Sequence, residues 1–380
     1  MKIKDKKMKK AILLTILMAH ALTAALSAQE LCDYYGLTAT QKKLYNQIVA
    51  GVENLDIRIE VDAKPETAEE LKAFNDVFII VRETHPEFFY LGNKAQTGKT
   101  GDKTWVWPVY VVDTVEVSVT IADGRVRYPT EDYMAKVKAV VEKRKAAVRD
   151  KLNDLPVHKG MTPYEIELAV HDWLYKQVAY NNETTNKNTI YGALVEGIAN
   201  CQGISRAFQY ILDTMGIECL LLGGPFVDGA GNEGPHQWNA VKLDSQWYQV
   251  DISSNVTGGK SNGLQHYHIY FNRTDAVMAL NHTIDTQAPF PKITCKATTY
   301  DYFRKNGLYI VSDDDFIKKM PAIITKARAN KDTMIELEFA KEYTSANNIL
   351  TKMKLIDASY SEGVNFMFMD LFGSVFGVFE

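Results

Sequence analysis

Residues 191–216 read YGALVEGIANCQGISRAFQYILDTMG and give the clearest structural signal in the chain. After Cys201 the apolar residues recur at helical spacing, which predicts a helix with one buried face that ends at Gly216. The apolar positions are Ile204, Phe208, Ile211, Leu212 and Met215. Cys201 is therefore expected in the first turn of a buried helix, where unpaired backbone N–H groups and the positive end of the helix dipole favour a thiolate.

The helix dipole alone does not make this cysteine a strong nucleophile. A free thiol has a pKa of about 8.5, and a helix terminus contributes roughly 0.3–1 kcal/mol, or about 2 kcal/mol in the best geometry. Because one pKa unit corresponds to about 1.4 kcal/mol, the dipole lowers the thiol pKa by about one unit. Strong activation needs a neighbouring cation, usually a histidine. Without one, Cys201 is better interpreted as an inert core residue.

A histidine and an aspartate occur in two short segments that are predicted to form a β-hairpin. Residues 235–243 read PHQWNAVKL and residues 246–251 read QWYQVD, and both alternate as strands do. If the two residues between them form the turn, His236 and Asp251 are diagonal neighbours on one face of the hairpin. A register slip of one residue would put them on opposite faces. The hairpin therefore predicts that the two side chains meet.

Together these three side chains predict nucleophilic catalysis at a carbonyl group. Cys201 would attack, His236 would accept the thiol proton and return one to the leaving amine, and Asp251 would orient the imidazole and stabilise its charged form. The backbone N–H of Cys201 would be one donor to the oxyanion. The further candidates for contacts with the substrate or the oxyanion are Gln202, Tyr191 and Trp238.

Several segments around these residues resemble the transglutaminase-like superfamily of papain-fold cysteine enzymes, in its secreted bacterial form. They are residues 191–194 (YGAL), 200–203 (NCQG), 215–217 (MGI), 218–224 (ECLLLGG), 236–241 (HQWNAV) and 247–251 (WYQVD). A weaker downstream pattern comprises residues 270–272 (YFN), His282 and residues 300–303 (YDYF). The resemblance covers about residues 160–310. One departure is Ile204, where many relatives carry an aromatic residue.

The resemblance implies an α+β fold with a papain-like or transglutaminase-like core, in which the nucleophile helix packs on an antiparallel sheet. It matches Cys201, His236 and Asp251 to a Cys–His–Asp triad position by position. Members of the superfamily include cross-linking acyltransferases, peptidases or amidases, and catalytically inactive scaffolds. Because all three chemical residues are present in this chain, an active enzyme is favoured.

Residues 1–28 are predicted to be a signal peptide. Residues 1–10 carry six lysines and one aspartate, residues 11–26 are largely apolar, and small residues follow where a peptidase could cleave. An uncleaved anchor is the alternative, although the apolar stretch is marginal for a span of about 20 residues. Loss of this net +5 segment would change the formal net charge from −4 to −9. No later segment is apolar enough to span a membrane.

The remaining chain divides into an N-terminal α/β region at 29–155, a catalytic domain at 156–310 and a small C-terminal α+β appendage at 311–380. The predicted helices before the catalytic cysteine are 38–54, 67–83, 131–152 and 162–180. Glycine, lysine and threonine cluster at 92–103, which predicts a loop, and 109–121 is a predicted strand. The appendage is predicted to contain a helix, a strand at 334–339, a second helix and a final apolar stretch.

Three other groups have both a chemical and a structural interpretation, and the structural one is favoured for each. His266 and His268 could be metal ligands on a strand, but no nearby cysteine or carboxylate completes a zinc site. His171 and Asp172 suit packing on their helix better than catalysis. The third group could be an aromatic platform for substrate or part of the N-terminal core, and comprises Trp105, Trp107 and Tyr110.

The composition limits the classes of cofactor and partner. Four cysteines are too few for a disulfide scaffold; if Cys201 stays free, at most one pair forms among Cys32, Cys219 and Cys295, and its identity stays open. No metal, calcium loop or organic cofactor is predicted. A sequence pI of about 6.1 argues against nucleic-acid binding, which usually requires a basic surface.

The sequence thus predicts an enzyme that is secreted, periplasmic or attached to the cell surface and that acts on amide bonds through a thioester. Its substrate would be a peptide or protein, including those of the cell surface or cell wall. Hydrolysis is favoured over amine transfer because water is the default acceptor and no amine pocket is visible. The alternative is a surface binding or assembly module with a vestigial triad, which the large non-catalytic regions 29–150 and 313–380 support.

Overall fold

The computed structural model describes residues 28–340, except 101, 113, 124, 262–263, 265–266 and 333, and the strands at 364–369 and 374–379. Three predictions lie outside the described residues, namely the signal peptide before residue 28, the candidate ligand His266 and the second helix of the appendage. Among the described residues, no helix has both the length and the apolar character that crossing a bilayer requires.

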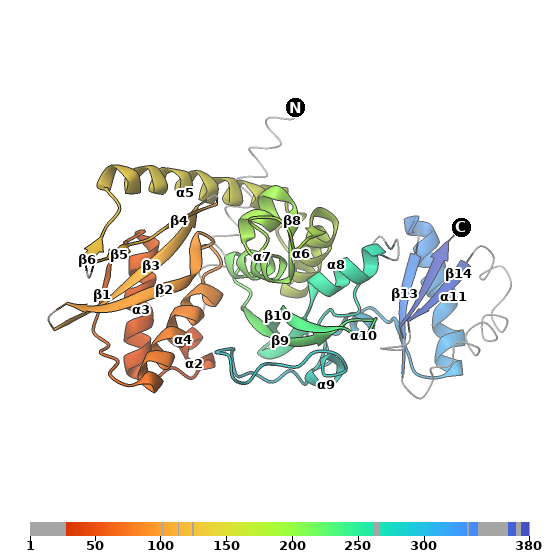
Figure 1. The fold of residues 1–380 in the computed structure, drawn as a ribbon. Coiled ribbons are helices and arrows are strands. Elements are labelled where there is room, and N and C mark those ends of the chain that lie inside the picture. Colours follow the sequence, from red (N-terminus) through yellow and green to blue (C-terminus); the bar gives the residue numbers. More distant parts are fainter. Residues whose placement is uncertain are drawn as a thin grey trace, which may run out of the picture.

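Three structural units follow one another along the chain and lie in a row in Figure 1. The N-terminal unit has a sheet of order β1-β3-β2, and helices pack around it. Strand β4 pairs with the C-terminal end of β3. Its helices are α2 (Ala28–Tyr34), α3 (Ala39–Glu53), α4 (Ala68–Thr84) and α5 (Glu131–Lys151). Its strands are β1 (Ile59–Val61), β2 (Leu91–Thr100), β3 (Lys103–Val112), β4 (Val115–Val117), β5 (Thr120–Ala122) and β6 (Arg125–Arg127).

The predicted helices of this unit form because their ends carry strong local signals. Thr38 and Thr67 each cap a helix through a reciprocal capping box, in which the threonine side chain accepts from the backbone N–H three residues on. Thr130 caps α5 through its side chain. Each of these three helices begins and ends within one residue of its prediction.

The loop predicted at 92–103 is wrong, because most of that segment is strand β2, which pairs antiparallel with β3. Gly98 lies against the indole of Trp107, where any Cβ would overlap the ring. Its small and polar residues thus suit close packing against a large aromatic side chain, although in isolation they favour a turn. The strand predicted at 109–121 is also interrupted, because β3 ends at Val112 and three short strands follow it.

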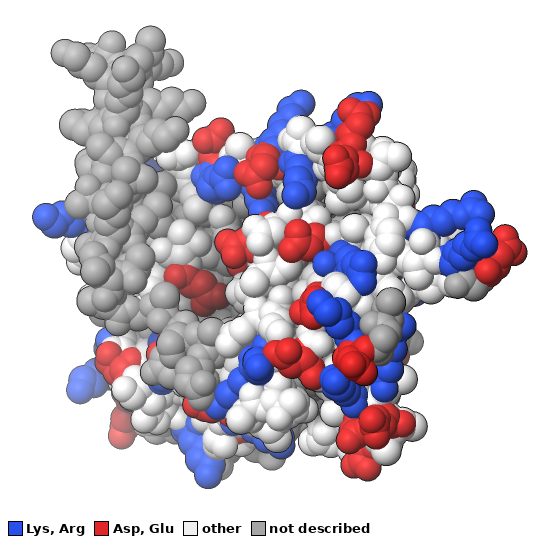
Figure 2. All heavy atoms as spheres, turned by 90° about the vertical axis from the view of Figure 1, so that its left-hand side faces the viewer, with Lys and Arg blue, Asp and Glu red and all other residues white. Residues whose placement is uncertain are grey.

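The aromatic residues of β3 belong to the N-terminal core, as the favoured interpretation expected. Trp105, Trp107 and Tyr110 are 9%, 4% and 0% exposed, so none can form a substrate platform. On the outside, Figure 2 shows lysine and arginine side chains interspersed with aspartate and glutamate over this side of the molecule. Among the described residues visible on this face, charges of the two signs alternate and do not gather into a basic patch.

The central unit packs a helix on a three-stranded antiparallel sheet of order β11-β10-β9. Its sheet strands are β9 (Cys219–Val227), β10 (Glu233–Leu243) and β11 (Gln246–Val250). Its helices are α6 (Pro163–Gln177), α7 (Cys201–Thr214), α8 (Ile252–Ser261), α9 (Asp275–Met278) and α10 (Tyr302–Lys305). Two further short strands, β7 (Ala179–Tyr180) and β8 (Ile198–Ala199), pair in parallel beside the start of α7.

Helix α7 is the helix predicted from the cysteine-containing segment. Asn200 caps its start by accepting a hydrogen bond from the Gly203 N–H at 3.2 Å, and Gly216 follows its end with φ +76°. The apolar face is fully buried, and each large side chain on it contributes about 1.5–3 kcal/mol through burial. This packing holds the first turn of the helix, and with it Cys201, in a fixed position.

The C-terminal unit has its own apolar core and joins the central unit through buried charges. Helix α11 (Asp313–Asn330) packs on a sheet of order β12-β13-β15-β14. The strands are β12 (Tyr309–Ile310), β13 (Met334–Phe339), β14 (Val364–Met369) and β15 (Ser374–Phe379). From β13, Glu336 contacts His268 at 3.1 Å, and Glu338 contacts Arg273 at 2.6 Å.

Candidate active site

Cys201 lies half-buried at the start of α7, as predicted. Its sulfur interacts with the imidazole of His236 and with the backbone N–H of Gln237. Both residues belong to β10, so the sheet that supports α7 also provides the partners of the thiol. None of the four cysteines forms a disulfide, and Cys32, Cys219 and Cys295 are buried free thiols.

The hairpin β10–β11 has the register that the predicted two-residue turn requires. Leu243 pairs with Gln246, and both turn residues, Asp244 and Ser245, have positive φ, as in a type I′ turn. Pairing continues to the end of β11, and the next residue is Asp251. The chain then turns into α8, which brings the Asp251 Oδ2 atom to 2.8 Å from His236 Nε2.

Burial and charge act in opposite directions on these groups. Burial raises the pKa of the Cys201 thiol, but the hydrogen bond and charge of His236 outweigh it, so that the pKa lies below its usual value. Burial lowers the pKa of His236, but the Asp251 carboxylate and the Cys201 sulfur raise it to about 10. The two shifts together favour a thiolate–imidazolium pair near neutral pH.

Asp251 is completely buried, and every part of its carboxylate is engaged. Its Oδ1 atom accepts from the Ser253 hydroxyl at 2.8 Å and from the Ser254 N–H at 3.0 Å. Its Oδ2 atom lies 2.8 Å from His236 Nε2 and 3.0 Å from His282 Nε2. Burial raises the pKa of Asp251, but the two imidazoles hold it well below the usual range. The carboxylate is therefore ionised and fixed in orientation.

His282 also belongs to this network, although the sequence did not predict a role for it at the site. It appeared only in the downstream pattern of the family resemblance, with no contact assigned to it. The structure brings it next to Asp251 through the segment after α9, and its Nδ1 atom lies 2.7 Å from Asn281 Oδ1. A sequence separation of 31 residues from Asp251 leaves no local pattern that could have revealed the pair.

Tyr180 is a second residue that the sequence reasoning missed. The helix predicted at 162–180 ends at Gln177, and Tyr180 lies instead in β7, paired with Ala199 two residues before the cysteine. Its hydroxyl lies close enough to the sulfur of Cys201 to interact with it. Burial first, and then the charge of Cys201, raise the pKa of Tyr180. A neutral phenol thus lies ready to donate to the thiolate.

The segment that contains this site also resembles a known protein family. The family model described as the transglutaminase-like superfamily matches residues 150–252, a segment that includes Cys201, His236 and Asp251. Residues 150–252 form a transglutaminase-like domain. The resemblance to this superfamily is thereby confirmed, together with the α+β fold class.

Solved structures that resemble the chain do so distantly, and no curated protein matches it. A TGase is 14% identical over 53% of this chain and 52% of its own, with a TM-score of 0.28. A candidate cysteine protease from Cytophaga hutchinsonii is 11% identical over 42% of this chain and 61% of its own, with a TM-score of 0.23. A candidate protease from Parabacteroides distasonis is 14% identical over 42% and 39%, with a TM-score of 0.21. The chain thus spans about 40–60% of the length of these proteins.

The three further candidates of the transglutaminase-like domain occupy different surroundings. Trp238 is 0% exposed and donates from Nε1 to Gln249 Oε1 at 2.7 Å. Its ring lies parallel to the imidazole of His236, with centroids 6.1 Å apart, so it supports the imidazole and cannot touch a substrate. Gln202 is half-buried beside Cys201 in the first turn of α7.

Tyr191, in contrast, packs against the N-terminal unit. Its ring stacks on Phe89, with centroids 6.0 Å apart, and the guanidinium carbon of Arg144 lies 4.6 Å from the ring centroid. These contacts account for the side chain without any role at the sulfur. Tyr191 therefore helps to join the two units, and its predicted contact with the oxyanion has no geometric support.

Among the described residues, two clusters in the central unit each bring three potential metal ligands within 4.8 Å of one another. One is His236, Asp251 and His282, and the other is His171, Asp172 and His268. In both, each ring nitrogen has a protein partner, and the nitrogen–oxygen distances around the aspartate are 2.8–3.0 Å, which are those of hydrogen bonds. Both clusters are thus complete hydrogen-bond networks.

Proposed function

We propose that the protein is an exported cysteine enzyme that cleaves amide bonds in a peptide or protein substrate through a thioester. The observation that supports this most is the position of His236, which lies between the thiol of Cys201 and the buried carboxylate of Asp251. A base flanked by a nucleophile on one side and an orienting acid on the other is the arrangement that acyl transfer requires.

The first half of the proposed reaction forms the thioester. Because His236 Nε2 bonds to Asp251, its Nδ1 atom is the one available to hold the thiol proton. The Cys201 thiolate attacks the amide carbonyl carbon, and the resulting oxyanion is met by the backbone N–H of Cys201, with Tyr180 as a second donor near the sulfur. The imidazolium then donates its proton to the amide nitrogen, the C–N bond breaks, and the amine leaves.

The second half regenerates the enzyme. Water enters the space left by the amine, His236 removes one of its protons, and the hydroxide attacks the thioester carbonyl. The C–S bond breaks, the thiolate is restored as an ion pair with the imidazolium, and a carboxylic acid is released. We favour hydrolysis over transfer because water is always available, whereas transfer to a primary amine would need a site that holds the amine in place.

Labelling with iodoacetamide tests the assignment of the nucleophile. In the full chain, Cys201 should react rapidly at pH 7, whereas Cys201→Ser should lose the rapid phase and all turnover. Cys295→Ser is the matched control, because that thiol is buried and burial raises its pKa. Rapid labelling that persists in Cys201→Ser would contradict the proposal. Mass spectrometry of a peptide library, incubated with and without a primary amine, separates hydrolysis from transfer.

The same experiment examines the alternative of a binding module with a vestigial triad. A wild-type protein that never forms a thioester, yet binds a partner equally well as Cys201→Ala, would favour that alternative. Export is tested separately by the mass of the mature protein recovered from the producing cells. Cleavage near residue 28 is expected, and a mature protein that retains residues 1–28 would contradict the predicted signal peptide.

A further inference from the structure

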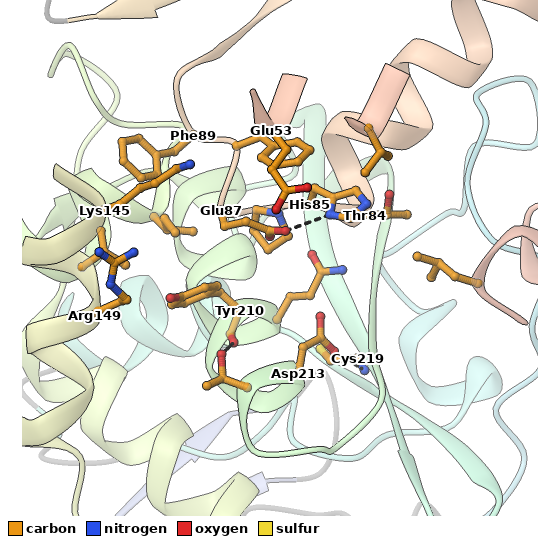
Figure 3. A pocket seen from close by; sticks show the side chains of 18 of the residues that line it. Glu53, Thr84, His85, Glu87, Phe89, Lys145, Arg149, Tyr210, Asp213 and Cys219 are labelled. Atoms are coloured by element: carbon orange, nitrogen blue, oxygen red, sulfur yellow. Dashed lines mark hydrogen bonds and ion pairs between the residues drawn. The ribbon is translucent and has the colours of Figure 1, made fainter. Parts of the chain in front are cut away.

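A cavity of about 560 Å³ lies between the N-terminal and central units, at the opposite end of α7 from Cys201. Its walls come from the ends of α3 and α4, from α5, and from the C-terminal half of α7 (Figure 3). This volume lies within the range of about 300–1,000 Å³ that is usual for sites of small ligands. Because α7 rises about 1.5 Å per residue, Asp213 lies roughly 18 Å from the nucleophile. A small ligand in the cavity therefore does not reach Cys201.

Opposite charges lie on different walls of the cavity. Figure 3 shows Lys145 and Arg149, both from α5, on one side, and Asp213 with Glu87 on the other. The Asp213 carboxylate is accessible to water although protein surrounds it, as expected for a group on a cavity wall. Burial first, and then the nearby carboxylates Glu87 and Glu218, raise the pKa of Asp213. A cation placed beside Asp213 lowers that pKa and keeps the carboxylate ionised, so an ammonium group is the partner that suits it.

Two of these charges have no ionic partner in the part of the chain that the structure describes. Glu87 pairs with His85 at 2.8 Å, and Lys145 pairs with Glu142 at 3.4 Å. Arg149 has no such partner. The only described hydrogen bond of the Asp213 carboxylate is from the backbone N–H of Cys219, at 3.3 Å. Glu53, at the end of α3, is a second lining carboxylate without an ion pair among the described residues. The cavity thus offers one unpaired cation, Arg149, and two unpaired carboxylates elsewhere on its lining.

Much of the remaining lining is apolar or aromatic. Its other polar members are Thr84, Thr214, the Gln209 amide and Glu218, which pairs with Lys242 at 3.0 Å. Phe88, Phe89 and Tyr210 provide aromatic surface. Gln209 is 1% exposed, and its Oε1 atom has no hydrogen-bond partner among the described residues. A buried amide oxygen without a donor costs about 1–3 kcal/mol, which a ligand N–H group could recover. Such a lining suits a ligand that has polar ends and an apolar middle.

We propose that this cavity binds a small zwitterion, namely a free amino acid or a short peptide with an apolar side chain. The ligand's ammonium group lies at Asp213, its carboxylate lies at Arg149, and its apolar part lies against the aromatic wall. A ligand without an ammonium group would leave the lining carboxylates without a partner, and a ligand without a carboxylate would leave Arg149 without one. The site is independent of the thiol chemistry, since it shares no residue with the triad.

Calorimetric titration of the full chain with alanyl-phenylalanine tests the proposal. The protein carries Cys201→Ala, so the probe is not consumed and the result does not depend on the proposed reaction. Three forms of the probe are compared, the free dipeptide, its N-acetyl form and its C-terminal amide. We expect either modification to weaken binding at least tenfold, because each removes one charged contact. Free amino acids and tripeptides show which length fits best.

Variants of the two walls give the sharper result. Asp213→Asn should weaken binding of the free dipeptide and of the amide at least tenfold, but leave the N-acetyl form unchanged. Arg149→Gln should weaken the free dipeptide and the N-acetyl form, but leave the amide unchanged. Lys143→Gln, on the same helix outside the cavity, is the matched control, and circular dichroism checks folding. Equal binding of all three forms, no effect of either variant, or no binding at millimolar concentration would overturn the proposal.

Discussion

The central unit contains the same trio of residue types twice, with different surroundings. Asp251 Oδ2 lies 2.8 Å from His236 Nε2 and 3.0 Å from His282 Nε2. Asp172 Oδ1 likewise lies 2.8 Å from His268 Nε2 and 3.0 Å from His171 Nδ1. In each trio one carboxylate oxygen bridges two imidazoles, so the aspartate alone does not distinguish the two.

The difference lies at the outer nitrogens of the imidazoles. The thiol of Cys201 is the outer partner of His236, and it can give up a proton and form a bond with carbon. The outer partner of His268 is the Glu336 carboxylate at 3.1 Å, and the Asn255 amide, 2.9 Å away, is that of His171. An amide nitrogen is not a nucleophile of this kind, and the Glu336 carboxylate is 2% exposed and bonded to His268, so a substrate cannot reach it. The group bonded to the outer imidazole nitrogen therefore decides the role of the network. An accessible thiol allows covalent chemistry, whereas a buried carboxylate only joins two units.

Substitution of the central aspartate should have the largest effect, and it should affect catalysis in one trio and stability in the other. We expect Asp251→Asn to lower kcat by about 10³–10⁴-fold, because the imidazole loses the charge that orients and stabilises it. Asp172→Asn should keep kcat within a few-fold of wild type but lower the free energy of unfolding by about 1–3 kcal/mol. Kinetic assays and urea unfolding of both variants provide the check. Similar losses of kcat in the two variants would remove the distinction.

If the second trio holds the central and C-terminal units together, the free energy of unfolding should depend on the charge of His268, and therefore on pH. Burial lowers the pKa of His268, but the charges of Glu336 and Asp172 raise it to about 10, against about 6.5 in the unfolded chain. The stabilisation is therefore complete below about pH 6.5 and is lost as the pH rises towards 10.

Urea unfolding between pH 6 and 10 measures this effect, which should amount to about 1–5 kcal/mol. His268→Gln should remove the part of the decline that belongs to His268 and leave the part that belongs to His236, whose pKa is also raised to about 10. His158→Gln, at an exposed histidine, should leave the decline as in wild type. If the free energy of unfolding of His268→Gln declines with pH as steeply as that of the wild type, His268 does not stabilise the fold through its charge.

The residues that support the first trio should have the smallest effects. Tyr180→Phe removes a donor to the thiolate, so we expect kcat to fall about tenfold, because a hydrogen bond to a charged group contributes about 1.5 kcal/mol. The pH at which iodoacetamide labelling is half-maximal should rise as well, since the thiolate is less stabilised. A purely structural role for Tyr180 would lower stability and leave that pH unchanged.

The sequence was most informative where one short segment contains both the pattern and its consequence. The apolar face of α7 and the two-residue turn of the hairpin are local features, so Cys201, His236 and Asp251 could be named and brought together from periodicity and register. The strand β2 was missed because its glycine and lysine residues favour a loop in isolation, and only pairing with β3 makes it a strand.

Local patterns in the sequence are enough to predict the cysteine at the start of a buried helix, the register of the hairpin that ends just before Asp251, and the transglutaminase-like domain at residues 150–252. Only packing between distant segments brings Tyr180 and His282 to the active site and Glu336 to the second trio, and only packing forms the charged cavity behind α7. The physical reason is the distance along the chain over which each interaction acts. Hydrogen bonding and periodicity within an element act over a few residues, whereas these contacts join segments that only packing brings together.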